Sequence, residues 1–386
     1  MRMYKHGIAL AVALFLQTGR SDAARGLYER AVENLRGRLV DALGPEAAAR
    51  IPVPFEIPAD LAGEVRAETR FVATSQLKCR KILHMIRGAD ALGIQYDRGY
   101  TMTARDLLDA RRGNCLSMAN LFIGMARSAG IDAQYVHVSD IDSYHEPEGS
   151  HDLSPILRSS HICAGYLEGT TLILFDATAG SIHQYKKKQL LDDLTAVALF
   201  YNNRAFEMMD LAGDASAVVI DAQIERCELA IRINPEFFLP YANLGTAYRR
   251  RGEWQKALDV YAKAIELNPT CAEAYSNRAA IYFSIGLCEI AIQEMAKAIS
   301  YNDSNSNLFW DAGRICYSLG RYADAASYFT KAIARDRNPR YYTSLARCWI
   351  AMDMPDFAVA SLEEAIATDP THADALRTLR ALRTAK

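Results

Sequence analysis

The chain has 386 residues, of which 50% are hydrophobic, so it is long enough for two or three globular domains, each with its own core. Its 44 lysines and arginines are balanced by 46 aspartates and glutamates, which gives a formal net charge of −2, and no long basic run is present. Because binding to a phosphate backbone needs a concentrated positive surface, this balance argues against a nucleic-acid partner.

The cysteines are scattered along the chain without CxxC pairs or interleaved histidines. Structural zinc sites need closely spaced ligands of that kind, so we expect no structural metal site. Most of the cysteines fall within helical patterns, where a free thiol usually acts as a small core residue, and nothing indicates a disulfide framework. They are Cys79, Cys115, Cys163, Cys227, Cys271, Cys288, Cys316 and Cys348.

The first 23 residues begin with basic side chains, continue with an apolar run from Ile8 to Leu16 and end near the small residues Ser21 to Ala23. This order is typical of a secretory signal peptide, so an exported protein, periplasmic or extracellular, is expected. The alternative is a core helix that continues into the following residues of a cytoplasmic protein. The apolar run is too short to span a bilayer, and no transmembrane span is expected in the mature chain.

Helical patterns follow. Residues 24–64 form an expected N-terminal helical segment, in which a helix ends at Gly44 and the proline-broken stretch IPVPFEIPAD forms a connector. The next stretch, AETRFVATSQLKCRKILHMIRGADALG, is also predicted to be helical and to end at Gly93.

The stretch NCLSMANLFIGMARSAG has apolar side chains at helical spacing and predicts a helix that starts at Cys115 and stops at Gly130. A helix N-terminus presents unpaired N–H groups and the positive end of the peptide dipoles, and both favour a thiolate over a thiol. Cys115 also lies on the apolar stripe, three residues before Met118. The helix alone therefore leaves open whether Cys115 is a nucleophile or a core cysteine.

Two strand-like runs, HICAGYL and TLILFD, predict a β-hairpin. A two-residue turn at Glu168-Gly169 would pair Leu167 with Thr170, and in that register His161 lies directly opposite Asp176. A three-residue turn would place these two side chains on opposite faces.

A cysteine nucleophile needs a histidine that takes the thiol proton. It also needs a carboxylate that orients the imidazole of that histidine. His161 and Asp176 fit these roles beside Cys115. The loop SDIDSYHEPEGSHDLSPILRS offers His145 and His151 as rival imidazoles, but neither lies in a strand-like run.

The string IQYDRGYTMTARDLLDARRGNCLSMANLFIGMARSAGIDAQYVHV, followed by SSHICAGYLEGTTLILFDAT, resembles the transglutaminase-like superfamily of papain-type folds. Members pair a Gly-x-Cys helix start with a histidine on one following strand and an aspartate at the end of the next, which correspond here to Cys115, His161 and Asp176. We place this domain at residues 65–190.

The resemblance implies an α+β fold in which the cysteine helix packs on an antiparallel sheet. It implies attack of the thiolate on an acyl group through a thioester, which water or an amine resolves, with no metal and no organic cofactor. Many members also carry an upstream side chain as a second oxyanion donor. The Cys115 backbone N–H is the first donor, and Tyr96 and Tyr100 are the candidates for the second.

A 34-residue period runs through the rest of the chain, residues 195–386. In the first full unit the signature positions of a tetratricopeptide repeat are held by Tyr241, Leu244, Gly245, Tyr248, Ala257, Tyr261, Ala264 and Pro269. Three more units follow, and THADALRTLRALRTAK has the polar face of a capping helix. A degenerate unit precedes them, with an extended connection expected around residues 215–220.

A single unit cannot bury its apolar faces, so the units must stack into a solenoid with a concave surface. The resemblance to tetratricopeptide proteins implies a protein or peptide partner in that groove, for which Asn243, Arg250 and Asn277 are candidate contacts. The run Arg249 to Arg251 has two interpretations: a clamp for an acidic peptide, or a solvated helix end, where cationic side chains are favoured.

The predicted fold class is therefore an α+β papain/transglutaminase-like domain followed by an all-α tetratricopeptide-repeat solenoid. The predicted function is that of a cysteine-dependent acyl-transfer enzyme, of protease, amidase or protein-crosslinking type, acting on a protein or peptide substrate. The alternative is a catalytically inactive scaffold in which both parts mediate protein–protein interactions.

Overall fold

The computed structural model describes residues 26–88, 91–97, 99–141, 161–176, 185–212 and 216–384. The chain divides into two compact units, Met1–Pro240 and Tyr241–Lys386, and each is described by itself. The expected signal peptide and the rival imidazoles of His145 and His151 lie outside the described residues.

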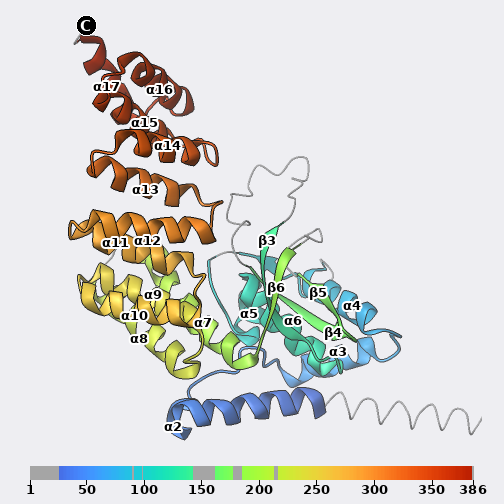
Figure 1. Ribbon diagram of the computed structural model, residues 1–386. Helices are drawn as coiled ribbons and strands as arrows, with labels where there is room; N and C mark the ends of the chain where they lie inside the picture. The colour runs from blue at the N-terminus through green and yellow to red at the C-terminus, as the bar shows by residue number, and fades with distance from the viewer. Residues whose placement is uncertain are drawn as a thin grey trace, which may run out of the picture. The chain divides into compact units, whose positions relative to one another are not determined.

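The first unit begins with helices joined by the predicted connector (Figure 1). A helix covers residues 26–43, and α2 (Pro45–Ala48), α3 (Ala59–Thr69) and α4 (Ser75–Arg87) follow. The expected run up to Gly93 is broken between α3 and α4, because the Thr74 side chain caps α4 by accepting a hydrogen bond from the N–H of Leu77. Gly44 has a positive φ and follows the first helix as predicted, whereas the predicted end at Gly93 is wrong, because α4 already ends at Arg87 with Gly88 as its C-cap.

The predicted helix at Cys115 is present as α6 (Cys115–Ser128). It follows α5 (Ala104–Ala110) and a short parallel pair of strands, β1 (Gln95–Tyr96) and β2 (Arg112–Gly113). Gly130 has a φ of 80° and ends the helical region as predicted. Every residue of α6 from Leu116 to Ser128 is buried, so α6 is a central helix of the unit and not a surface helix with one apolar stripe.

An antiparallel sheet packs against α6 in the order β5-β4-β3-β6 (Figure 1). Its strands are β3 (Gln134–Ile141), β4 (His161–Glu168), β5 (Thr171–Phe175) and β6 (Tyr185–Leu191). Phe122 of α6 stacks on Phe175 of β5 with ring centroids 5.4 Å apart. This is the α+β arrangement that the sequence predicts, with β6 as a strand that the sequence analysis did not identify.

The predicted hairpin register is wrong by two residues. The turn is Gly169-Thr170, so Glu168 pairs with Thr171, and the pairing continues to Ala164 opposite Phe175. Gly169 has a φ of 62°, which suits the first central position of a two-residue hairpin turn. Asp176 therefore follows the residue opposite Ala164 and does not lie opposite His161.

The far side of α6 packs against the connector. A Cβ on Gly124 would overlap the backbone oxygen of Phe55 and lie 2.9 Å from a methyl group of Ile57. At the end of α6, the buried Arg127 guanidinium lies 4.5 Å from the centroid of the Phe55 ring and donates hydrogen bonds of 2.8 Å to both carboxylate oxygens of Asp193. A bidentate pair of this kind fixes both orientation and position.

Asp193 opens α7 (Asp193–Ala212), which packs against α8 (Ala217–Ile233) within the first unit. The extended connection expected around residues 215–220 is wrong, because α8 already begins at Ala217. The sequence predicts repeats from residue 195, and the contacts of the chain divide it at Pro240.

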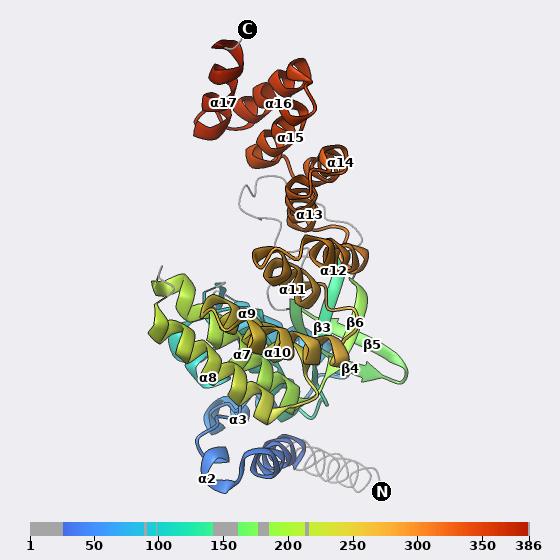
Figure 2. The ribbon, with the colours of Figure 1, turned by 60° about the vertical axis from the view of Figure 1, so that its left-hand side comes forward.

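The second unit consists of stacked helix pairs (Figure 2). They run from α9 (Phe238–Arg250), which opens in the first unit, through α10 (Trp254–Leu267), α11 (Ala272–Ser284), α12 (Cys288–Tyr301), α13 (Ser306–Ser318), α14 (Tyr322–Ile333), α15 (Pro339–Ala351) and α16 (Pro355–Thr368) to the terminal α17 (Ala373–Thr384). A Cβ on Gly245 would lie 2.5 Å from the Tyr261 ring, and one on Gly313 equally close to Phe329.

Candidate active site

The start of α6 is held by its N-cap residue, Asn114. The Asn114 side-chain oxygen accepts a hydrogen bond of 3.0 Å from the N–H of Ser117, and its amide group donates one of 2.7 Å to the Thr101 hydroxyl. The Ser117 hydroxyl in turn accepts a hydrogen bond of 2.8 Å from the N–H of Met102. These bonds fix the backbone from which Cys115 projects.

Cys115 occupies the first position of α6 and is the one residue of that helix that is not buried. It packs partly against the core of the first unit while part of its surface stays accessible. A partly exposed cysteine at a helix N-terminus resembles reactive cysteines in its setting more than it resembles buried, inert ones.

His161 and Asp176 lie together despite the changed register. His161 Nε2 is 3.0 Å from Asp176 Oδ2, and the two side chains are only 10% and 13% exposed. Side chains at diagonal positions on one face of a sheet are still within reach of each other, and a shift of two residues keeps them on that face. The hydrogen bond thus forms between diagonal neighbours.

The pKa of His161 is raised from 6.5 to about 10. Burial by itself lowers the pKa of this imidazole, but hydrogen bonds to Asp176 and to Cys115, together with the charges of both partners, more than offset it. The structure therefore brings Cys115, His161 and Asp176 into one hydrogen-bonded array in which the protonated imidazole is favoured.

Neighbouring titratable groups behave differently. His137, on β3, has a lowered pKa, chiefly because of burial and also because of the charge of His161. Burial raises the pKa of the thiols of Cys227, Cys271 and Cys348 to about 12 each. Burial also raises the pKa of the Cys163 thiol, which is buried in the sheet beside Asp176.

The two candidate oxyanion donors lie before α6. Tyr96 is 44% exposed and pairs across the short parallel sheet with Gly113, which precedes Asn114 and Cys115. Tyr100 is 37% exposed, and its backbone oxygen accepts hydrogen bonds from the N–H of Asn114 and the hydroxyl of Ser117. The strand pairing places Tyr96 beside the segment that leads to Cys115, while Tyr100 supports it through its backbone.

Helix α7 reaches the same segment. Glu207 Oε1 accepts a hydrogen bond of 2.7 Å from the N–H of Thr101 and lies 3.5 Å from the amide nitrogen of Asn114. Burial raises the pKa of Glu207, although the hydrogen bonds from Thr101 oppose that effect. Sequence reasoning missed this residue, because nothing local in α7 indicates a contact with the start of α6.

Sequence reasoning also missed Tyr185, the first residue of β6. Its hydroxyl donates a hydrogen bond of 2.9 Å to Asp176 Oδ2. Its ring is stacked on the His161 imidazole, with centroids 6.4 Å apart. The one local signal is an aromatic residue before a run of lysines, which does not by itself predict a strand.

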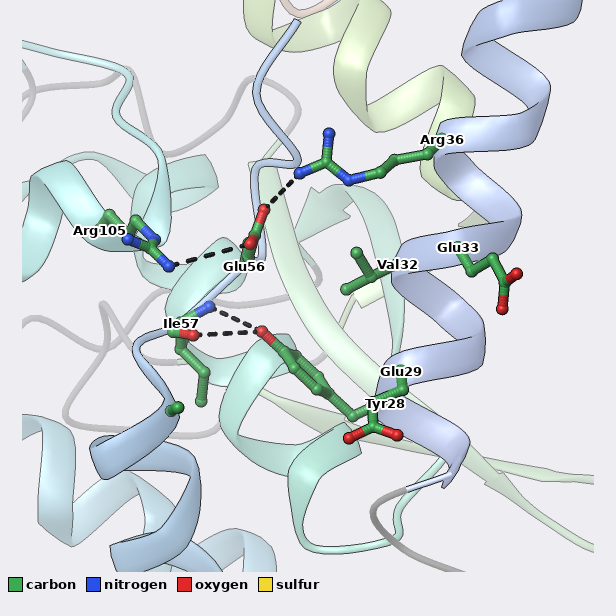
Figure 3. A pocket seen from close by; sticks show the side chains of 9 residues that line it. Tyr28, Glu29, Val32, Glu33, Arg36, Glu56, Ile57 and Arg105 are labelled. Carbon is green, nitrogen blue, oxygen red and sulfur yellow. Dashed lines mark hydrogen bonds and ion pairs between the residues drawn. The ribbon is translucent and has the colours of Figure 1, made fainter. Parts of the chain in front are cut away.

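A pocket of about 450 Å³ in the first unit lies elsewhere (Figure 3). Glu56 pairs there with Arg36 at 2.9 Å and with Arg105 at 3.8 Å, and the Tyr28 hydroxyl bonds to the backbone of Ile57. None of Cys115, His161 and Asp176 lines this pocket. These contacts hold the connector that packs on α6, and we assign the pocket a structural role.

The candidate partner contacts lie on the first helices of two repeats. Asn243 and Arg250 belong to α9, where Arg250 is the exposed last residue, and Asn277 belongs to α11. The Asn277 amide nitrogen lies 3.4 Å from the hydroxyl of Thr246. In the described part of the chain, no cluster of His, Cys, Asp and Glu side chains is arranged to hold a metal ion. No helix among the described residues is both long and apolar enough to cross a membrane.

Comparison with known families agrees with these two architectures. Residues 66–170 match the transglutaminase-like superfamily, residues 245–286 match the TPR repeat, and residues 281–342 match the tetratricopeptide repeat. The chain thus carries a transglutaminase-like domain followed by tetratricopeptide repeats, and repeats of this type suggest protein or peptide binding. No curated protein matches the chain.

Solved structures similar to the chain include three repeat proteins. MamA is 23% identical to this chain. The match covers 43% of this chain and 95% of the MamA chain, with a TM-score of 0.38. YrrB, described as a TPR protein with an unusual peptide-binding site, is 16% identical. The match covers 47% of this chain and 92% of YrrB, with a TM-score of 0.39. A thermophilic TPR protein in Thermus thermophilus is 19% identical. The match covers 48% of this chain and 99% of the Thermus protein, with a TM-score of 0.38.

Proposed function

We propose that the protein is a cysteine-dependent acyl-transfer enzyme that acts on a protein or peptide, with Cys115, His161 and Asp176 as its catalytic residues. The observation that carries the proposal is the buried hydrogen bond between His161 Nε2 and Asp176 Oδ2, with Cys115 hydrogen-bonded to the same imidazole at the start of α6. A nucleophile, a base and an orienting group in one array have the geometry of a triad.

The imidazole has two nitrogens, and Nε2 faces Asp176. Nδ1 is then the nitrogen that meets the Cys115 sulfur. With a pKa of about 10, His161 holds a proton at neutral pH, and an imidazolium favours a thiolate beside it. Asp176 stabilises the charged ring and keeps Nδ1 directed at the sulfur.

In the reaction, the Cys115 sulfur attacks the carbonyl carbon of an amide, and the His161 proton goes to the leaving nitrogen as the C–N bond breaks. The acyl group is left as a thioester on Cys115. His161 then takes a proton from water or from an amine, which attacks the thioester and restores the thiolate. Water gives hydrolysis or deamidation, and an amine gives transfer or crosslinking.

Charge that develops on the carbonyl oxygen during attack needs hydrogen-bond donors. The first N–H groups of a helix have no acceptor within the helix, so the Cys115 N–H supplies one donor. Tyr96 is the better candidate for a second donor, because β1 pairs with the strand that leads directly into the Asn114 cap. The repeats then supply a docking surface for the substrate protein or for a partner that presents it.

The test is brief treatment of the folded full chain with iodoacetamide near pH 6, followed by peptide mapping. Cys115 should be alkylated well ahead of the buried repeat cysteines, whose thiols are protonated at that pH. His161→Ala should slow the alkylation of Cys115 by an order of magnitude or more, because it removes the partner of the thiolate. His372→Ala, in the second unit, is the matched control and should change nothing.

The scaffold alternative predicts a different result. If Cys115 is alkylated no faster than Cys271, Cys316 and Cys348, or if His161→Ala has no effect, the domain holds an ordinary cysteine. The function would then be protein binding through the repeats alone.

A further inference from the structure

Two strands send side chains to Asp176, which itself directly follows a third strand. His161 comes from the start of β4, Asp176 directly follows β5, and Tyr185 opens β6. His161 Nε2 and the Tyr185 hydroxyl lie 3.0 Å and 2.9 Å from the same carboxylate oxygen, Oδ2. One oxygen of Asp176 therefore serves two partners.

The sheet order makes this contact unusual. β5 and β6 are the two outer strands, and β4 and β3 lie between them. The hydrogen bond from Tyr185 to Asp176 thus connects the two outer strands near the start of β4, where His161 lies. Among the described residues, β5 and β6 do not pair through their backbones, so this side-chain hydrogen bond is a contact that links them at this end of the sheet.

The Tyr185 ring also contacts the imidazole. The two rings are inclined by only 22°, with centroids 6.4 Å apart, and Tyr185 is 8% exposed. The imidazole is then held at its Nε2 by Asp176 and on one side by the Tyr185 ring. A ring that cannot rotate keeps its second nitrogen directed at one place.

We propose that Tyr185 is a positioning residue for the triad: its hydroxyl fixes the Asp176 carboxylate and its ring fixes the plane of His161. This inference rests on the proposed function. Tyr185 acts through Asp176 and His161 and needs no contact with substrate.

Among the described residues, the titratable groups that interact with Asp176 or His161 come from α6, β3, β4 and β6. They are Cys115 on α6, His137 on β3, His161 and Cys163 on β4, and Tyr185 and Lys188 on β6. Burial and the nearby Asp176 charge raise the pKa of Tyr185, so its hydroxyl stays protonated and remains a donor. A donor to a carboxylate favours the ionised form, and the ionised form is the one that supports the imidazolium.

The experiment compares Tyr185→Phe with wild type in the rate of Cys115 alkylation as a function of pH, from about pH 4 to about pH 9. The variant keeps the ring and loses the donor. In Tyr185→Phe, the part of the pH profile in which the alkylation rate rises from its acidic minimum should move to higher pH by about 0.5–1 unit. The alkylation rate near pH 5 should therefore fall about 3- to 10-fold. Tyr185→Leu, which also loses the ring, should fall further at every pH.

Tyr166→Phe is the matched control. Tyr166 lies on β4, its ring stacks on Phe175 at 6.1 Å, and its buried hydroxyl has no hydrogen-bond partner among the described residues. The change removes a hydroxyl from the same sheet without touching Asp176, so the pH profile should stay at the wild-type position. A similar shift in Tyr166→Phe would show that any loss of a buried hydroxyl disturbs the site, and would overturn the inference.

An Asp176→Asn background separates positioning from general loss of structure. If Tyr185 acts through the carboxylate, Tyr185→Phe should add almost nothing to the pH profile of Asp176→Asn. Equal shifts in both backgrounds would contradict the inference. If His161→Ala leaves Cys115 alkylation unchanged, the proposed function itself is wrong. If His161→Ala slows alkylation while Tyr185→Phe keeps the wild-type profile, only the role of Tyr185 is wrong.

Discussion

The two units bring their important residues together in different ways. In the repeats, Gly245 meets Tyr261 of the next helix, and the same contact recurs two periods later between Gly313 and Phe329. In the transglutaminase-like domain, Cys115 is joined by residues from three strands and is supported by α7. Local contacts that recur produce a repeated pattern in the sequence and can be predicted from it. A site assembled from distant segments depends instead on how the strands and helices that carry it pair with one another.

The largest effect should come from Gly124→Ala, which tests whether the first unit is one cooperative body. The added Cβ meets the backbone of Phe55, which cannot move without shifting the connector. We expect a loss of about 3 kcal/mol or more in the urea unfolding of the first unit, together with loss of rapid Cys115 alkylation.

Gly63→Ala in α3 is the control for that change. No described atom outside its own surroundings lies within 4 Å of the position that its Cβ would take. Alanine should therefore stabilise α3 slightly, by about 0.5–1 kcal/mol. Equal effects of the two substitutions would mean that α6 and the connector do not pack as described.

An intermediate effect is expected for Gly245→Ala in the repeats. The Cβ would lie 2.5 Å from the Tyr261 ring, which must shift, at a cost of about 1–3 kcal/mol. Because each repeat contacts only its neighbours, hydrogen exchange should quicken in α9 to α12 and change little in α15 to α17. Uniform exchange changes across the unit would contradict this local behaviour.

The second repeat supplies the matched control for Gly245→Ala. One period on, Ala279 and Met295 occupy the two positions and lie in one buried cluster. The double change Gly245→Ala with Tyr261→Met copies that pair and should recover part of the lost stability. Failure to recover any of it would mean that the two repeats are not packed alike.

The last expected effect is a pH dependence of the stability of the first unit. The pKa of His161 rises from 6.5 to about 10 on folding, so its contribution to stability is fully present below about pH 6.5 and is lost as the pH rises through about 10. The difference in urea midpoint between wild type and His161→Ala should shrink over that range. A difference that stays constant would show that the imidazole is not held as its contacts indicate.

The helix at Cys115 could be predicted to within a residue because its signals are local. Asn114 is a strong N-cap residue, and Gly130 takes the positive φ that ends the region. The repeats could be predicted for the same reason, since Gly245 and Ala279 lie at a fixed period. The absence of the expected extension before α8 shows the limit of this approach in a degenerate unit.

The hairpin shows why His161 and Asp176 could be expected to lie together although the predicted register is wrong. Glu168-Gly169 and Gly169-Thr170 are both plausible turns, and the sequence does not distinguish them. Moving a two-residue turn by one position changes the pairing by two, and side chains alternate with a period of two. His161 and Asp176 therefore stay on one face in either register, although they are diagonal and not opposite.

Tyr185 could not be predicted by such reasoning. The lysines that follow it have low strand propensity, and β6 pairs with β3, which is distant in the chain. Glu207 was missed because its partners, Thr101 and Asn114, lie in a segment far from α7. Both residues support the array from outside the hairpin and the cysteine helix.

Helix α7 bears on how chains of this kind can be recombined in evolution. Asp193 neutralises the buried Arg127, and Glu207 accepts the hydrogen bond of Thr101 beside the Asn114 cap. A genetic breakpoint before α7 would leave a buried guanidinium without its carboxylate and would remove a support of the α6 cap, at a cost of several kcal/mol. A breakpoint behind α8 cuts neither contact. We therefore expect α7 to be inherited together with the domain that carries Cys115.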